Sequence, residues 1–157
     1  MTVSSVQNVQ PYELSAKQLE SYKENGYLVI DDFFSIHEHQ DLTSYCHEFQ
    51  NWGKEKGKWM QYYEINTVSG ENQLCRTENF TPFHEGMAGY VKSQRLLNVL
   101  EKLHGEEYVL FKEKVNYKLP GGGGKAKKKM NTNNLIFFGA GRGKNAFMHV
   151  VTDFIVI

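Results

Sequence analysis

Residues 106–124 read EEYVLFKEKVNYKLPGGGG and decide the fold. Because side chains alternate between the two faces of a β-strand, residues 106–118 predict a strand with one apolar and one polar face. The apolar face would carry Val109, Phe111, Val115 and Tyr117, and the polar face Lys112, Lys114, Asn116 and Lys118. We expect the apolar face to pack in the core and the four glycines after Pro120 to form a turn.

Two interpretations of the polar face are open. The first is a sheet with one solvated face, which is common among antiparallel sheets. The second is the wall of a pocket for a carboxylate or a phosphate, because ammonium groups beside an amide can hold an anionic ligand. In the second interpretation the binding residues are Asn116, Lys112 and Lys114.

The length and composition indicate one soluble domain. The chain has 157 residues, of which 40% are apolar and 13% aromatic, and this is enough for one hydrophobic core. The sequence shows no signal peptide and no run of about 20 apolar residues, so we expect a cytoplasmic protein without a membrane partner. Cys46 and Cys75 are too few for a disulfide framework and favour two reduced thiols. The oligomeric state is not indicated.

Two helices are predicted by their N-terminal capping residues. Ser15 with Gln18, and Ser35 with Glu38, have the spacing of capping boxes. The first helix would end at Gly26. The second would end near Trp52 and Gly53, with Leu42, Tyr45, Cys46 and Phe49 recurring on one apolar face.

A third helix and two short strands are predicted by hydrophobic spacing. The helix fits residues 93–104, with Gly105 as its stop, and it would turn Leu96, Leu97, Leu100 and Leu103 inward. Residues 27–34, YLVIDDFF, predict a short buried strand followed by a turn, and residues 59–65, WMQYYEI, predict another strand.

The composition changes at Gly124. Residues 1–124 contain 12 Lys or Arg and 17 Asp or Glu, a net charge of −5, whereas residues 125–157 contain 6 and 1, a net charge of +5. Lys, Asn, Ile, Phe and Met, which have A/T-rich codons, make up 30 of the first 124 residues but 18 of the last 33. We therefore expect residues 125–157 to be a disordered or non-native tail that arose from a retained intron or a frameshift.

Three stretches together resemble one enzyme family. They are LSAKQLESYKENGYLVIDDFFS at 14–35, CRTENF at 75–80 and FKEKVNYKLPGGGG at 111–124. They resemble the N-terminal part of the phytanoyl-CoA dioxygenase family, whose members use Fe(II) and 2-oxoglutarate. The resemblance covers about residues 12–124, which we take as the N-terminal part of a dioxygenase-like domain.

The resemblance implies a fold and a reaction. The fold class is α+β, with N-terminal helices packed on an incomplete double-stranded β-helix, or jelly-roll, sheet. In the family, iron is held by a His-x-Asp pair and a distant His, a triad that leaves positions open for 2-oxoglutarate and oxygen. The strand before the His-x-Asp pair contributes polar side chains to the 2-oxoglutarate site, and here the matching residues are Lys112, Lys114 and Asn116. A complete member would hydroxylate a small organic substrate.

The sequence departs from the family directly after the glycines. There it reads KAKKKMNTNN, with no His and no Asp, and the distal His and an Arg that pairs with 2-oxoglutarate are also missing. We therefore expect a chain that is truncated before the metal ligands, that contains no catalytic or metal-binding residue and that is inactive by itself. The alternative is a non-catalytic relative that acts as an anion-binding or interaction module.

Other candidate motifs have weaker support. His39 and Asp41 form a literal His-x-Asp, but they fall in the first turns of a helix and are expected to be surface residues. The other candidates are His149 with Asp153, which lack a third ligand, residues 139–145, GAGRGKN, which miss the P-loop pattern, and residues 125–129, KAKKK, which lack the aromatic residues of a nucleic-acid site. His84 and His104 are expected to be ordinary surface or capping residues.

Overall fold

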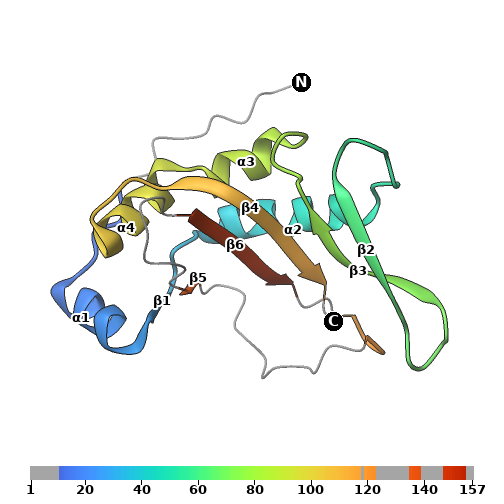
Figure 1. Cartoon of the computed structure of the whole chain (residues 1–157), viewed down its shortest axis with the longest axis horizontal. Coiled ribbons are helices and arrows are strands. Elements are labelled where there is room, and N and C mark those ends of the chain that lie inside the picture. Colours follow the sequence, from blue (N-terminus) through green and yellow to red (C-terminus); the bar gives the residue numbers. More distant parts are fainter. Residues whose placement is uncertain (1–10, 118, 123–134, 139–146, 155–157) are drawn as a thin grey trace.

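The computed structural model describes residues 11–117, 119–122, 135–138 and 147–154. The helices are α1 (Ala16–Asn25), α2 (Ile36–Gln50), α3 (Glu85–Val91) and α4 (Gln94–His104). The strands are β1 (Tyr27–Ile30), β2 (Met60–Ile65), β3 (Asn72–Glu78), β4 (Val109–Tyr117), β5 (Leu135–Phe138) and β6 (Phe147–Phe154). The architecture is α+β, as the sequence predicts (Figure 1).

Four strands form the main sheet, in the order β2-β3-β4-β6. The pairs β2–β3 and β3–β4 are antiparallel, and β6 lies parallel to β4, its neighbour in Figure 1. Strand β1 pairs with β5 in a separate antiparallel ladder. Helix α2 lies behind the main sheet in the view of Figure 1, so it covers this face of the sheet.

The core contains residues of α2, α3 and α4, of β1 and of one face of β4. Its most deeply buried side chains include Ile30, Phe49, Phe80, Val99 and Val115. Neither Cys46 nor Cys75 is in a disulfide, consistent with the two predicted thiols. Cys46 lies in this core, where burial raises the pKa of its thiol to about 12. Among the described residues, no helix is long and apolar enough to cross a membrane.

The two helices predicted from their capping residues and the third predicted from hydrophobic spacing are confirmed. Ser15 and Ser35 each accept a hydrogen bond from the backbone three residues on, and both capping boxes are complete. Helix α4 begins after Ser93 and ends at Gly105, as expected. Helix α2 ends at Gln50, slightly before the predicted end. Helix α3 and strand β3 were not predicted.

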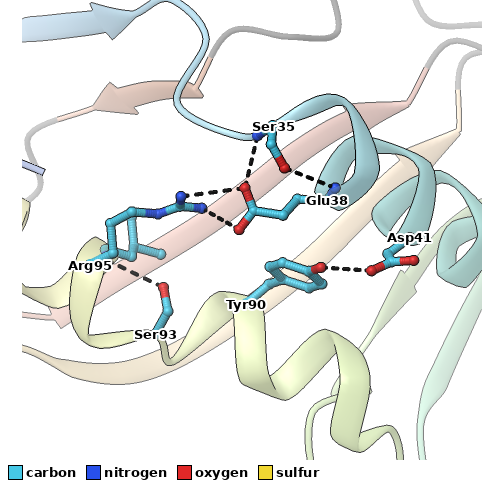
Figure 2. A network of polar contacts seen from close by, with 7 residues as sticks. Ser35, Glu38, Asp41, Tyr90, Ser93 and Arg95 are labelled. Carbon is cyan, nitrogen blue, oxygen red and sulfur yellow. Dashed lines mark hydrogen bonds and ion pairs between the residues drawn. The ribbon is translucent and has the colours of Figure 1, made fainter. Parts of the chain in front are cut away.

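Helix α2 is tied to α4 by a bidentate ion pair (Figure 2). The Arg95 Nη2 lies 2.9 Å from the Glu38 Oε1, and Nη1 donates to Oε2 at 3.3 Å. Both side chains are largely covered, at 10% and 15% exposure, and the guanidinium lies 4.6 Å from the centre of the Phe33 ring. Burial raises the pKa of Glu38, but the hydrogen bond from the Ser35 backbone N–H and the charge of Arg95 outweigh it, so the pKa is lowered. The pair therefore stabilises the packing of the two helices.

The His39–Asp41 pair lies in the same helix. Asp41 Oδ2 accepts a hydrogen bond from the Tyr90 hydroxyl at 2.8 Å, which joins α2 to α3 (Figure 2). This contact and the burial of the ring raise the pKa of Tyr90. Asp41 is therefore part of the packing between helices.

The expected core face of β4 is wrong in its first half. Val115 and Tyr117 are buried, but Val109 and Phe111 are 65% and 62% exposed. The reason is a register shift between Leu110 and Lys112 in the pairing with β6. One extra residue at such an irregularity reverses which side chains face inward. Before it, Tyr108 is buried and Leu110 packs on the core, and after it the alternate residues Glu113, Val115 and Tyr117 are buried.

Some predictions fall partly or wholly outside the described residues. Lys118, residues 125–129 and residues 139–145 are not described. Strands β5 and β6 lie within residues 125–157. His149 and Asp153 are in β6, where the backbone register sets them opposite Lys112 and Asn116 of β4.

Candidate functional site

The polar face of the main sheet gathers side chains from three strands. The backbone register sets Tyr62 of β2 opposite Arg76 of β3, and Arg76 opposite Asn116 of β4. Two residues further along β3, Glu78 is opposite Lys114 of β4. Residues opposite each other on neighbouring strands project on the same face, so these five side chains share one surface.

Glu78 is the buried centre of this face. Its side chain is only 2% exposed, although it is ionisable. The Lys112 Nζ lies 2.8 Å from Oε2, the Arg76 Nε lies 3.0 Å from Oε1, and the Tyr62 hydroxyl donates to Oε2 at 3.4 Å. A buried carboxylate is costly unless it is paired, and here two cations surround it.

The side chains of β3 and β4 on this face carry an excess of positive charge, and the backbone register sets Asp153 of β6 opposite Asn116. Arg76, Lys112 and Lys114 carry three positive charges, and Glu78 carries the single negative charge among them. Lys112 and Arg76 are 43% and 35% exposed in their side chains, so the cations border solvent above the buried carboxylate. Such a face favours an anionic ligand over a cationic one.

The three residues predicted for anion binding do lie along one side of β4. Lys112, Lys114 and Asn116 are each partly buried and alternate with the buried Glu113, Val115 and Tyr117. Their environments differ, because Lys112 is paired with Glu78, whereas Lys114 makes no ion pair with any described residue. The prediction that they share a face is therefore confirmed, and their role in binding stays a prediction.

The covered side of the sheet holds the strands in position. The hydroxyls of Thr77 and Tyr117 are 3.0 Å apart and both side chains are buried. Burial raises the pKa of Tyr117, and the hydrogen bond with Thr77 opposes this only in part. Glu113 accepts hydrogen bonds at 2.9 Å from the Thr81 backbone N–H and from its hydroxyl, which fixes the segment after β3 to β4.

The predicted glycine turn follows β4 and is held by the β2–β3 connection. The Gly122 N–H donates to the Leu119 carbonyl at 3.2 Å, and Gly121 has a positive φ of 77°. The Thr67 N–H and hydroxyl both donate to the Gly121 carbonyl, at 2.7 and 3.0 Å. Asn66 Nδ2 donates to the Pro120 carbonyl at 3.0 Å. The turn is therefore docked at the end of the polar face, 54 residues away in sequence from its partners.

The glycines of this turn are required by close approach as well as by backbone conformation. A Cβ on Gly121 would collide with the side chain of Asn66. A Cβ on Gly122 would collide with Glu64 and lie 2.9 Å from the Gln73 amide. The first two glycines of the run thus fit a space that no side chain could share.

The described residues do not form an iron site. Among them, no three His, Cys, Asp or Glu side chains are grouped so as to hold a metal ion. His84 caps α3, as predicted, by accepting a hydrogen bond from the Met87 N–H at 2.9 Å. His104 is not a cap, because it lies 2.8 Å from the Tyr22 hydroxyl and packs between the rings of Tyr22 and Tyr108. We therefore derive no chemical step through a metal.

Comparisons with known proteins agree in kind with the sequence resemblance. No family model matches the chain. A 2-aminoethylphosphonate dioxygenase of the uncultured bacterium HF130_AEPn_1 is 38% identical over 108 residues, which cover 69% of this chain and 41% of that protein. A methylphosphonate hydroxylase of Gimesia maris is 36% identical over 113 residues, 72% of this chain and 43% of the relative. A protein named as a probable alpha-ketoglutarate-dependent hypophosphite dioxygenase, of Stutzerimonas stutzeri, is 26% identical over 109 residues, 68% and 38% of the two chains.

The chain is related to dioxygenases. It spans about two fifths of the length of the curated relatives that it matches. The names of these relatives are those of dioxygenases and a hydroxylase.

Three site residues were missed by sequence reasoning. Tyr62, Arg76 and Glu78 complete the polar face, yet only the lysines and the asparagine of β4 were predicted. Strand β3 is hard to recognise because its side chains do not alternate simply between the two faces. In the pairing with β2, Tyr62 is opposite Arg76 and Tyr63 is opposite Leu74, so Cys75 is an extra residue in β3. The signal that could have found these residues is the Arg-x-Glu spacing in CRTENF, which places two opposite charges on one face of a strand.

Proposed function

We propose that the complete protein is an Fe(II)- and 2-oxoglutarate-dependent dioxygenase of the phytanoyl-CoA dioxygenase family. In this proposal the described helices and the β2–β3–β4 sheet form the N-terminal part of a jelly-roll domain. The names of the relatives support dioxygenation, and one of those names specifies alpha-ketoglutarate dependence. The iron, when bound by the complete protein, supplies the oxidising chemistry that consumes oxygen and 2-oxoglutarate.

The observation that carries the proposal is the cationic polar face that ends at the docked glycine turn. 2-Oxoglutarate is a dianion, and Lys114 and Asn116 offer an ammonium and an amide on the same side of β4. Lys112 adds positive charge beside them, although its ammonium is paired with Glu78. The donor set therefore fits a carboxylate, and the role of these residues would be to bind and orient the cosubstrate.

The substrate class is suggested by the names of the relatives. Three relatives are named for small phosphorus compounds, namely 2-aminoethylphosphonate, methylphosphonate and hypophosphite, while another is named only as a dioxygenase. We propose a small organic substrate and take phosphonates as the first compounds to test. Neither nucleic acid nor a membrane is needed for this function, and we keep the cytoplasm as the expected compartment.

The extent of the dioxygenase-like part is proposed from length and composition. Residues 12–124 number 113, which is close to the 108 and 113 residues matched in two relatives. We propose that residues 125–157 have another origin, as a retained intron or a frameshift would give. Sequencing the gene and its transcript across codons 120–160 tests this, and an uninterrupted transcript with no ligand-bearing sequence in another frame or exon would refute it.

Titration of the chain with 2-oxoglutarate, with and without Mn(II), tests the function together with a succinate assay. Mn(II) replaces Fe(II) in the binding titration because it does not oxidise in air, whereas the succinate assay is run with Fe(II). The variant Lys114→Gln should weaken binding several-fold, and Lys92→Gln, an exposed lysine at the end of α3, is the matched control. Binding without metal dependence and without succinate is expected of this chain under both proposals, and succinate formation by the complete protein with Fe(II) separates the dioxygenase from the non-catalytic anion-binding module. Absence of 2-oxoglutarate binding would reject the cosubstrate site on this face.

A further inference from the structure

The guanidinium of Arg76 is held in one orientation on the polar face. Its Nε lies 3.0 Å from the buried Glu78 carboxylate, and its central carbon lies 4.3 Å from the centre of the Tyr62 ring. The contact with Glu78 is an ion pair and not a hydrogen bond, because the Nε–H is not directed at the oxygen. Tyr62 in turn donates its hydroxyl to the same carboxylate at 3.4 Å. One face of the guanidinium and one of its edges are thus fixed by two neighbours.

The far end of the same guanidinium has no partner among the described residues. Its two terminal nitrogens make no hydrogen bond and no ion pair within that part of the chain. Arg76 is opposite Asn116 in the register, and Lys114 follows on the same side of β4. The guanidinium of Arg76, the amide of Asn116 and the ammonium of Lys114 therefore belong to neighbouring positions on one partly exposed surface.

Lys112 has a different role. Its ammonium lies 2.8 Å from the Glu78 Oε2, so it neutralises the carboxylate that also orients Arg76. An anion that took the ammonium of Lys112 for itself would leave the buried Glu78 with one cation fewer, which is unfavourable. An anion that binds the terminal nitrogens of Arg76 leaves both cations beside Glu78, Lys112 and Arg76, in place.

We infer that Arg76 is the oxyanion-binding residue of this face and that Glu78 positions it. The ligand class is an anion with two coplanar or nearly coplanar oxygens, because an arginine fork binds such a group through two parallel N–H···O hydrogen bonds. The carboxylate of 2-oxoglutarate and the phosphonate group of a substrate share this chemistry. The inference deepens the proposed function and rests on it for the identity of the ligand.

Calorimetric titration of the full chain with 2-oxoglutarate and, separately, with methylphosphonate tests the inference. Arg76→Gln should lose at least tenfold in affinity for one of the two anions, and that anion identifies the ligand. Arg76→Lys keeps the charge but removes the fork, and it should lose nearly as much. Lys102→Gln, an exposed lysine in the last turn of α4, is the control and should bind like the parent.

The variant Glu78→Gln separates positioning from simple electrostatics. It keeps the size of the side chain and raises the net charge of the face by one. A face that acts only through its charge would then bind the anion more tightly, whereas loss of the oriented guanidinium should weaken binding at least threefold. The melting of each variant is followed by circular dichroism, and if Arg76→Gln does not fold, Arg76→Lys decides.

The outcomes distinguish this inference from the function it rests on. If the parent binds an anion and both Arg76 variants bind it equally well, the role of Arg76 is refuted and the cosubstrate face stands. Tighter binding by Glu78→Gln refutes the positioning role of Glu78. If the parent binds neither anion, the cosubstrate face and the role of Arg76 are both refuted.

Discussion

Replacing Gly121 by alanine should destabilise the chain more than the same change at a glycine of equal backbone conformation. Gly121 and Gly105 both have a φ of 77°, but a Cβ on Gly121 meets Asn66 whereas a Cβ on Gly105 meets nothing within 4 Å. The left-handed conformation alone costs alanine about 1 kcal/mol. Gly105→Ala therefore measures the cost of the conformation, and Gly121→Ala adds the cost of the collision.

The size of the collision term follows from the hydrogen bonds of Asn66. Its Nδ2 donates to the Pro120 carbonyl and to the Gln73 side chain, at 3.0 and 2.8 Å. Its Oδ1 also accepts from the Val68 and Ser69 N–H groups, at 2.8 and 3.0 Å. Moving the side chain aside loses at least two of these four bonds, each worth about 1 kcal/mol net. We expect Gly121→Ala to lower the free energy of unfolding by about 3 kcal/mol and Gly105→Ala by about 1 kcal/mol.

Urea denaturation followed by tryptophan fluorescence measures both variants. A difference of about 2 kcal/mol should separate their midpoints by about 1 M urea. In an Asn66→Gly background the collision partner is gone, so Gly121→Ala should then cost only about 1 kcal/mol. Equal midpoints for Gly121→Ala and Gly105→Ala would refute the close approach between the glycine turn and the β2–β3 connection.

Four further predictions concern ionisable groups. Arg95→Met leaves Glu38 largely covered without its cation and should cost about 2–3 kcal/mol in urea denaturation at pH 7, with Arg95→Lys intermediate; an unchanged midpoint would show that the pair contributes nothing. The pKa of Glu38 in the folded chain is lowered below its ordinary 4.5, so the stability that Glu38 adds is complete above pH 4.5 and is lost as the pH falls through the folded pKa. Glu38→Gln should therefore reduce the fall of the melting temperature at acid pH. Burial lowers the pKa of His104 below 6.5, and the charge of Glu106 only partly opposes this shift, so the stability of the chain should fall as the pH drops below 6.5. His104→Gln should reduce that fall, which is measured by comparing melting temperatures at pH 7.5 and 5.5. Glu113→Ala removes the acceptor of two hydrogen bonds from Thr81 and should cost about 2 kcal/mol, while Glu107→Ala, exposed just before β4, should cost less than 0.5 kcal/mol; similar costs at both positions would contradict the buried role.

The elements that could be predicted are those whose signals are local. Helices α1, α2 and α4 each begin at a serine with a hydroxyl that bonds to the following backbone, and this signal lies within four residues of sequence. Helix α3 lacked such a signal because its first turn is capped by the ring nitrogen of His84, a residue type that the usual capping preferences do not include.

The parts that could not be predicted depend on pairing between distant strands. The exposure of Val109 and Phe111 follows from a register shift relative to β6, and nothing within residues 106–118 reveals it. The same reason applies to the site. The side of β4 that carries Lys114 could be recognised from alternation alone, but the buried Glu78 and the Arg76 beside it come from β3, and only the sheet brings them to Lys112.

The docking of the glycine turn has a consequence for the order of folding. The Thr67 N–H reaches the Gly121 carbonyl across 54 residues, so this bond can form only after β3 and β4 have paired and brought the two loops together. Exchange of the Thr67 amide proton with solvent deuterium therefore reports on the completed sheet and not on any local turn. Protection of this single amide from exchange can thus be used to follow the pairing of β3 with β4.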